Sequence, residues 1–317
     1  MRSAWGYLAR YFALFLDGRS LSVGVALVLS MAALGLTSLG GWAAAEEYSA
    51  YSDPEKPALS LVLSEDQNVE EFQKEFALSD EEVEDALAAV RKENEALARE
   101  YAESEQIVES SEDLTEEEVK EKIAASDYDE EVEKAVAQTK STIEGLLPEG
   151  RASDLKSWVD SRWQQEGVEF QASGDTTFKA ASTRGVRCKV FATQYIGYTR
   201  YEVALPHKKL KFDGGFRVRL RRGAHHARAP VKEVGPWNIR DNYWQSRRYR
   251  DMWDDLPRCK PEAQAAYFNN YNGGRDQFGR KVLNPAGVDL TPRVARRLGL
   301  KKYQNAWIYV RYPWVRR

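Results

Sequence analysis

Apolar side chains recur every three or four residues through much of the first half of the chain. They are Val83, Ala86, Leu87, Val90, Leu97 and Tyr101 in one stretch, and Val119, Ile123, Val132, Val136, Ile143 and Leu147 in later ones. This spacing places them on one face of an α-helix, so the pattern predicts amphipathic helices. One further helix is predicted from Leu155, Trp158, Val159 and Trp163. We therefore expect a helical region over residues 64–168.

Three polar residues stand where a helix is expected to begin, and each is followed three residues later by Glu or Gln. The pairs are Ser64 with Gln67, Ser79 with Glu82, and Thr115 with Glu118. This spacing is that of the capping box, in which the Ser or Thr side chain accepts a hydrogen bond from a backbone N–H that has no partner inside the helix. The sequence therefore predicts helix starts at these three positions.

After Gly167 the helical period gives way to short runs rich in β-branched and aromatic residues. These runs cover residues 188–195, 198–205, 216–220, 231–234 and 306–312. Gly and Pro residues separate them, which is typical of a compact barrel or sandwich of short strands. A brief helix fits between Pro292 and Gly299. The expected fold class is α+β, with a helical region followed by a small β domain.

Residues 1–45 contain three Arg near their start and then, over residues 21–45, no charged side chain. This order, which ends in Ala43-Ala44-Ala45, is typical of a secretory signal with a small-residue cleavage site. A helix over the same uncharged stretch is also long enough to span a bilayer, so an uncleaved signal-anchor is the alternative. Both alternatives place residues 46–317 outside the cytoplasm. We therefore expect a secreted protein or one tethered in the cell envelope.

The formal net charge of −3 conceals two regions of opposite sign. Residues 46–150 carry 33 acidic and 9 basic side chains, whereas residues 151–317 carry 15 acidic and 34 basic ones. This asymmetry indicates either different partners, with a basic partner for the acidic helices, or attraction between the two halves of the chain. The acidic region contains no His or Cys, so we expect a spacer or interaction module. Residues 46–63, which include Pro54 and Pro57, are expected to be a linker.

Cys188 and Cys259 are the two cysteines of the chain. In an exported protein such a pair is expected to form a disulfide, although two buried thiols would give the same sequence. A zinc site needs more Cys or His ligands than this spacing offers. The adjacent His225 and His226 would point to opposite sides of a strand, so a basic surface turn is the better interpretation. We therefore expect no metal site and no cofactor.

Three separate stretches of the second half resemble the rare lipoprotein A family, which is related to expansins and barwin-like proteins. They are residues 204–212 (Ala-Leu-Pro-His-Lys-Lys-Leu-Lys-Phe), residues 231–236 (Val-Lys-Glu-Val-Gly-Pro), and residues 288–292 (Val-Asp-Leu-Thr-Pro) with Ala295 and Leu298-Gly299 after them. The resemblance implies a double-psi β-barrel over residues 181–315. Residues 237–286 would form a long, aromatic-rich insertion in it.

The resemblance also implies candidate catalytic residues. Members with lytic activity on peptidoglycan use an Asp before Arg-Gly-Pro, and Glu233 stands at that place here. Cleavage of a glycosidic bond needs a carboxylic acid that protonates the leaving oxygen. Glu233 is therefore the expected general acid or base, with His207 positioning it or the substrate. Glu202 is a weaker candidate for the acidic residue that the family carries upstream of the His.

Asp289 is expected to be structural, because an Asp before a helix that opens with Thr-Pro can cap backbone amides. Gly235 and Pro236 are likewise expected to be structural. Aromatic side chains of the insertion are the expected glycan-binding residues, because sugar rings stack on Trp and Tyr faces: Trp237, Tyr243, Trp244, Trp253 and Tyr271.

These observations lead to three functional hypotheses. The first is an exported cell-envelope protein that binds peptidoglycan-like glycan without cleaving it. The second is a peptidoglycan lytic transglycosylase that uses Glu233. The third is a structural adaptor whose acidic helices recruit a basic partner. Nucleic acid is disfavoured as a partner outside the cytoplasm, and a membrane is expected only through residues 21–45 if they stay uncleaved.

Overall fold

The computed structural model describes residues 48–111, 113–172, 185–195, 197–212, 215–302 and 304–315. The expected signal or anchor at residues 1–45 lies outside this part of the chain. Among the residues that are described, no helix is both long and apolar enough to cross a membrane. Ser49–Arg317 form one compact unit, so the helical region and the β domain are packed together as one body.

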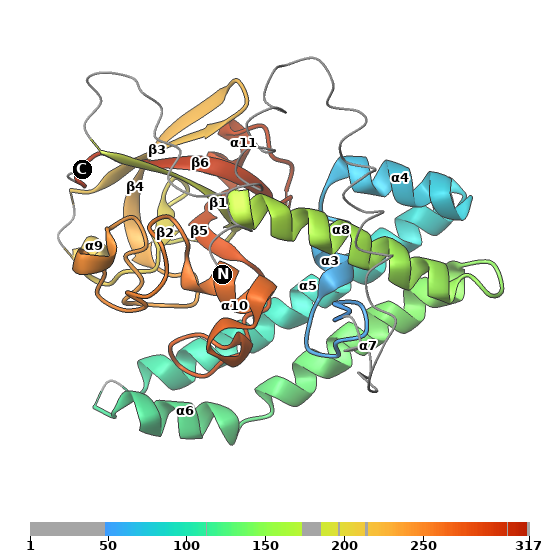
Figure 1. The fold of residues 1–317 in the computed structure, drawn as a ribbon, viewed down its shortest axis with the longest axis horizontal. Helices are drawn as coiled ribbons and strands as arrows, with labels where there is room; N and C mark the ends of the chain where they lie inside the picture. Colours follow the sequence, from blue (N-terminus) through green and yellow to red (C-terminus); the bar gives the residue numbers. More distant parts are fainter. Residues whose placement is uncertain are drawn as a thin grey trace, which may run out of the picture. The chain divides into compact units, whose positions relative to one another are not determined.

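The helical region contains six helices in chain order (Figure 1). They are α3 (Ala58–Val62), α4 (Asp66–Phe76), α5 (Asp80–Glu109), α6 (Glu116–Ala124), α7 (Tyr128–Leu146) and α8 (Ala152–Ala172). The long helices α5 and α7 run side by side. Their shared face buries the apolar residues that carried the helical period, including Val90 and Val132. The prediction of helices in this half is confirmed.

Two of the three predicted helix starts have the expected capping box. At the start of α5, Ser79 accepts from the Glu82 backbone N–H at 3.3 Å, and the Glu82 carboxylate accepts from the Ser79 N–H at 2.7 Å. Thr115 begins α6 in the same way. Ser64 was predicted wrongly, because its hydroxyl donates back to the carbonyl of Leu61 at 2.7 Å. Ser64 therefore follows the C-terminal end of α3, and α4 begins two residues later.

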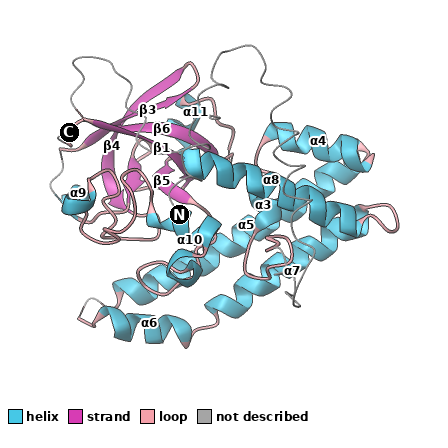
Figure 2. Ribbon diagram, viewed as in Figure 1, coloured by secondary structure: helices cyan, strands magenta, loops and turns pink. Residues whose placement is uncertain are grey.

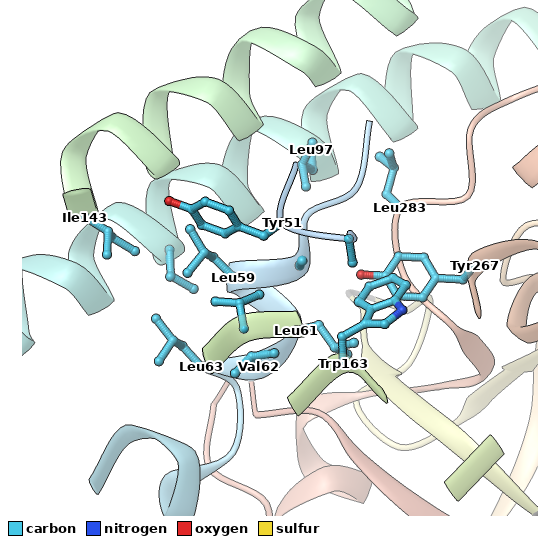
Figure 3. Packing of buried hydrophobic residues seen from close by; sticks show 14 of the residues in the cluster. Tyr51, Leu59, Leu61, Val62, Leu63, Leu97, Ile143, Trp163, Tyr267 and Leu283 are labelled. Carbon is cyan, nitrogen blue, oxygen red and sulfur yellow. The ribbon is translucent and has the colours of Figure 1, made fainter. Parts of the chain in front are cut away.

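Residues 46–63 differ from the expected linker, because α3 is buried in the hydrophobic core. All five residues of α3 are buried, and the helix packs against α5 and α8. Figure 3 shows this short helix among side chains from both halves of the chain: Tyr51, Leu59, Leu61, Val62, Leu63, Leu97, Ile143, Trp163, Tyr267 and Leu283. The two prolines lie just before an apolar run that is too short to show a helical period, so the sequence suggested a linker.

The second half forms a closed six-stranded barrel, which confirms the α+β class (Figure 2). Its strands are β1 (Val186–Gln194), β2 (Val203–Leu205), β3 (Arg217–Arg222), β4 (His225–Val234), β5 (Ala286–Leu290) and β6 (Ala306–Tyr312). The order around the barrel is β1-β5-β2-β4-β3-β6. The pairs β1–β5 and β2–β4 are parallel, and the other four are antiparallel. Short helices connect the strands: α9 (Lys209–Phe212), η1 (Arg247–Tyr249), α10 (Glu262–Asn269), η2 (Tyr271–Gly274) and α11 (Pro292–Arg297).

The expected disulfide is present and fixes the insertion to the barrel. Cys188 of β1 is bonded to Cys259 of the insertion, 71 residues later, and both side chains are fully buried. A cross-link that closes a loop of this length removes conformational freedom mainly from the unfolded chain. The disulfide thereby fixes the insertion at residues 237–286 to β1 of the barrel.

Arg280 of the insertion is the central contact between the acidic helices and the basic half. Its guanidinium is fully buried. It donates to the Asp276 carboxylate at 2.6 Å, to the Trp237 carbonyl at 2.5 Å and to the Glu105 carboxylate of α5. The same group lies 4.8 Å from the ring centroid of Tyr101, also on α5. One side chain therefore ties a helix to the insertion through charge, hydrogen bonds and an aromatic face.

Further ion pairs follow the same interface. They join Arg275 to Asp129 at 2.6 Å, Lys281 to Glu55 at 2.6 Å and to Glu133 at 3.0 Å, and Arg240 to Glu116 at 3.0 Å. Part of the charge asymmetry seen in the sequence is thus neutralised within the chain. Of the two interpretations of that asymmetry, attraction between the halves accounts for these contacts.

The R280M variant tests how much this interface depends on Arg280. Loss of the guanidinium leaves the buried Asp276 carboxylate without its ion-pair partner, which should cost about 3–5 kcal/mol of unfolding free energy. The control variant R275M breaks the half-exposed pair with Asp129 and should cost less than about 1 kcal/mol. Urea unfolding of both variants measures the two losses. Equal losses would contradict a central role for Arg280.

Glu93 on α5 is a carboxylate inside the helical core. Its side chain is 2% exposed and accepts a hydrogen bond from the Ser60 hydroxyl of α3. Burial raises its pKa to about 7, although the hydrogen bonds with Ser60 and Thr139 favour the charged form. Because the folded-state pKa is raised, the folded protein loses stability as the pH rises from the ordinary pKa of a Glu towards 7.

Replacing Glu93 by Gln should remove this pH dependence. Between pH 5 and pH 8 the unfolding free energy of the wild type should fall by about 2–3 kcal/mol relative to that of E93Q. The control variant E95Q changes an exposed residue of the same helix and should follow the wild type. Urea titrations at both pH values measure the difference. A constant gap between wild type and E93Q would show that Glu93 is not the titrating group.

Candidate functional site

A row of side chains crosses four neighbouring strands on the outer face of the barrel. Ala204 of β2 pairs with Asp289 of β5 on one side and with Glu233 of β4 on the other. Asp289 also pairs with Thr193 of β1. Paired residues of adjacent strands point to the same face of the sheet, so the four side chains are aligned. The preceding residue, Val203, points into the barrel core.

A shift in register between β2 and β4 places the Glu233 side chain in this row. Val203 pairs with Val231, but the next residue of β2, Ala204, pairs with Glu233, so Lys232 is left without a counterpart. Such a bulge redirects the side chain that follows it. Glu233 is half-buried, and its carboxylate accepts from the backbone N–H of Val234 at 2.9 Å. Without the bulge, Lys232 would occupy the position next to Ala204.

Asp289 has the environment of a candidate general acid, and its expected capping role is wrong. Its carboxylate is half-buried and accepts a hydrogen bond from the Thr193 hydroxyl. Burial raises its pKa to about 6; the Thr193 hydrogen bond opposes the shift and the negative charge of Glu105 on α5 adds to it. The N-cap of α11 is Thr291. The register of β5, which sequence alone does not give, directs Asp289 towards β1 and α5.

Tyr195 contacts one carboxylate of this region and is influenced by the charge of two others. Its hydroxyl lies 3.3 Å from a carboxylate oxygen of Glu202, which is fully buried and also accepts from the Thr199 hydroxyl at 2.6 Å. Burial raises the pKa of Tyr195, and the charges of Glu202, Asp289 and Glu233 raise it further. These three acids therefore lie around one neutral phenol. Tyr195 was not among the site residues expected from the sequence, although it stands at the end of the first predicted strand.

His207 has partners in the insertion instead. Its Nε2 atom lies 3.5 Å from the Asp251 carboxylate, and its ring meets the Trp244 ring edge-on at 6.2 Å. Its backbone forms a bridge with Arg240. Burial lowers its pKa, and Asp251 opposes that shift. Asp251 is thus the acidic residue whose charge acts on His207. The described side-chain contacts of His207 are with the insertion.

Three of the five expected glycan-binding aromatics are buried, so they offer no face to a sugar. The exposed fractions of Trp237, Tyr243 and Trp244 are 3%, 0% and 2%. Trp244 stacks on Tyr312 of β6 with ring centroids 4.8 Å apart. The Tyr243 hydroxyl donates to the Gly287 carbonyl at 2.7 Å. These rings form the core that joins the insertion to the barrel, and the prediction of a binding role for them is wrong.

Trp253 and Tyr271 remain partly exposed. Their rings meet edge-on with centroids 5.6 Å apart, and the Tyr271 hydroxyl donates to Asp255 at 2.6 Å. Gly235 and Pro236, expected to be structural, follow Glu233 at the end of β4 and are joined by a cis peptide bond. The backbone of Gly235 adopts φ 130°, a region that favours glycine.

An open depression of about 620 Å³ adjoins the carboxylates on the side of Glu202. It is lined by Gly197, Tyr198, Thr199, Arg200, Thr291, Pro292, Arg293 and Arg296. Among the described residues, none of its three guanidinium groups has an ion-pair partner. The depression is therefore positive, whereas the row beside it is acidic. Within the same residues, no group of three or more His, Cys, Asp or Glu could hold a metal ion.

Comparison with known proteins gives one partial match. A family described as a domain of unknown function (DUF8814) matches residues 177–311, which contain the barrel and its insertion. No curated protein and no solved structure matches the chain. The chain is thus similar to that family over its second half, and the acidic helices lie outside the match.

Proposed function

We propose that the barrel is a double-psi β-barrel of the rare lipoprotein A type. Two observations support this topology. A six-stranded closed barrel with two parallel pairs, β1–β5 and β2–β4, needs crossover connections, and each parallel pair contains one register shift. The stretches that resemble the family also fall at corresponding ends of strands: residues 231–236 end β4, and residues 288–299 run from β5 through α11.

On this basis the chain is an exported envelope protein that acts on peptidoglycan-like glycan. The observation that carries the proposal is the carboxylate row, in which Asp289 and Glu233 flank Ala204 on one face of the barrel. The carboxyl group of Asp289, with a pKa of about 6, keeps a proton on a useful fraction of molecules near neutral pH. An acid of this kind is what glycosidic cleavage requires.

The reaction that fits is that of a lytic transglycosylase. Asp289 donates its proton to the glycosidic oxygen as the bond from that oxygen to the sugar carbon breaks. The C6 hydroxyl of the same sugar forms a new bond to that carbon, and its proton passes to the Glu233 carboxylate. The products are a 1,6-anhydro sugar and a chain with a free hydroxyl. Return of the proton from Glu233 to Asp289 restores the site.

The surroundings of the row fit an anionic glycan. The Tyr195 hydroxyl, which donates its hydrogen bond to Glu202, can accept a hydrogen bond from a sugar hydroxyl. Arg200, Arg293 and Arg296 in the adjoining depression can hold a carboxylate, such as that of a peptide stem, through paired hydrogen bonds. The acidic row would therefore cleave the bond, and the basic depression would align the substrate.

Wall binding without cleavage is the second candidate function. The observation that favours it is the partly exposed ring pair of Trp253 and Tyr271, whose edge-on contact leaves ring surface for a sugar. In that case the protein should sediment with sacculi, release nothing, and lose binding in the W253A variant.

Digestion of purified sacculi tests cleavage directly. The wild type should release 1,6-anhydro-muropeptides, detected by mass spectrometry, and D289N and E233Q should lower the rate about a hundredfold or more. The control variant D254N changes an exposed carboxylate of the insertion and should keep full activity. All variants should still sediment with sacculi. Undiminished release by D289N would exclude Asp289 as the acid.

The pH profile gives a second test through Thr193. If Asp289 must be protonated, the rate should fall as the pH rises through about 6. The Thr193 hydroxyl stabilises the carboxylate, so its removal in T193V should raise the pKa and move the descending limb to higher pH. T142V, at an exposed position of α7, is the control. An unmoved limb in T193V would contradict the assignment.

A further inference from the structure

The strands β3 and β4, both labelled in Figure 2, form a hairpin. This hairpin carries a concentration of positive charge that the proposed site does not use. Residues 217–232 contain five Arg, one Lys and two His, and no Asp or Glu. On β3 the exposed residues are Arg217, Arg219 and Arg221, which alternate with the buried Val218 and Leu220. The inner face of the hairpin therefore belongs to the barrel core, and its outer face is almost entirely cationic.

The strand register sets these charges directly against one another. Arg219 faces Arg228 of β4 on one side and Arg311 of β6 on the other, and Arg311 faces Arg187 of β1. Like charges opposite each other on adjacent strands destabilise a sheet. Among the described residues, Arg217, Arg219 and Arg228 have no ion-pair partner. The fold requires only the apolar inner face, so the outer charges are a cost that folding does not explain.

The spacing and chemistry of this face fit a linear phosphate polymer. Successive outward side chains of β3 are about 6.6–6.8 Å apart along the strand. This spacing suits an extended polymer that carries one negative charge in each short repeating unit. The planar guanidinium binds phosphate through two parallel hydrogen bonds, and five of the six cations are Arg.

Two other anionic partners, single-stranded nucleic acid and a lipid bilayer, fit this surface less well. Proteins that bind single-stranded nucleic acid stack the bases on aromatic rings, and binding to a bilayer surface uses apolar side chains that insert. The outward positions of the hairpin offer neither: they are Arg217, Arg219, Arg221, His226, Arg228, Pro230 and Lys232. On the neighbouring strand, Tyr309 faces Arg221, but the Arg187 guanidinium lies 6.0 Å from its ring centroid.

We propose that the outer face of the β3–β4 hairpin, centred on Arg219 and Arg228, binds a phosphodiester polymer without bases, such as a polyol-phosphate chain of a cell envelope. The binding is electrostatic and bidentate, and it runs along the strand direction of β3. Its residues lie on β3 and β4, whereas the row extends from Glu233 at the end of β4 across β2 and β5 to β1. The binding does not depend on glycan cleavage. The protein would thereby hold a second envelope polymer beside the one at the carboxylate row.

Binding of the full-length chain to poly(glycerol phosphate), measured by fluorescence anisotropy, tests the proposal. The R219Q/R228Q variant should bind at least tenfold more weakly than the wild type. The control R247Q/R248Q removes the same charge from exposed arginines of η1 and should change the affinity less than twofold. R219K/R228K keeps the charge without the planar fork and should give an intermediate loss. Equal losses in the two Gln variants would overturn the proposal.

Two further arms identify the polymer and separate this face from the catalytic site. A single-stranded oligonucleotide of equal charge and vesicles of anionic lipid should both bind more weakly than the polyol phosphate; tighter binding of either would overturn the proposed occupant. D289N should bind poly(glycerol phosphate) like the wild type, whether or not it releases sugar from sacculi.

R219Q/R228Q should melt at the same temperature as the wild type or higher, because the change relieves repulsion. A lower melting temperature would contradict the inferred cost of the arginine row.

Discussion

The buried guanidinium of Arg280 is the contact on which the arrangement of this protein depends. It binds Glu105 of α5 and Asp276 of the insertion, and it lies against the Tyr101 ring. These contacts hold α5 against the insertion. Because Glu105 is one of the groups that raise the pKa of Asp289, the same contact also shapes the candidate acid. Stability of the interface and chemistry of the site are therefore linked through one helix.

Some charged side chains of the chain pair with one another across the interface between its two halves, and others stay exposed at the surface. Carboxylates of the acidic helices pair with cations of the insertion, as Asp129 does with Arg275. The β3–β4 hairpin keeps its arginines exposed, with Arg219 directly facing Arg228. The formal net charge of −3 is thus the sum of charges that pair at this interface and of charges, such as those of Arg219 and Arg221, that stay exposed. The exposed charged side chains are the ones that a charged partner could contact.

The sequence predicted features that depend on local spacing. The helical period, the capping box at Ser79 and the pairing of the two cysteines are of this kind. Features that depend on register or on burial were not predictable. Asp289 stood before a helix and suggested a cap, but its partner comes from β1, about a hundred residues earlier in the chain. Trp244 suggested a binding surface, because an aromatic residue in the core and one at the surface look the same in a sequence.

This distinction also separates the two proposed binding regions. The carboxylate row takes Thr193, Ala204, Glu233 and Asp289 from four strands, and a single bulge decides that Glu233 rather than Lys232 faces Ala204. Such a site exists only when the whole barrel has closed in the correct register. The cationic hairpin is built from sixteen consecutive residues, so its charge pattern can be seen in the sequence and needs the fold only to select its outer face. Substitutions that shift the barrel register should therefore abolish the first region while leaving the charge of the second intact.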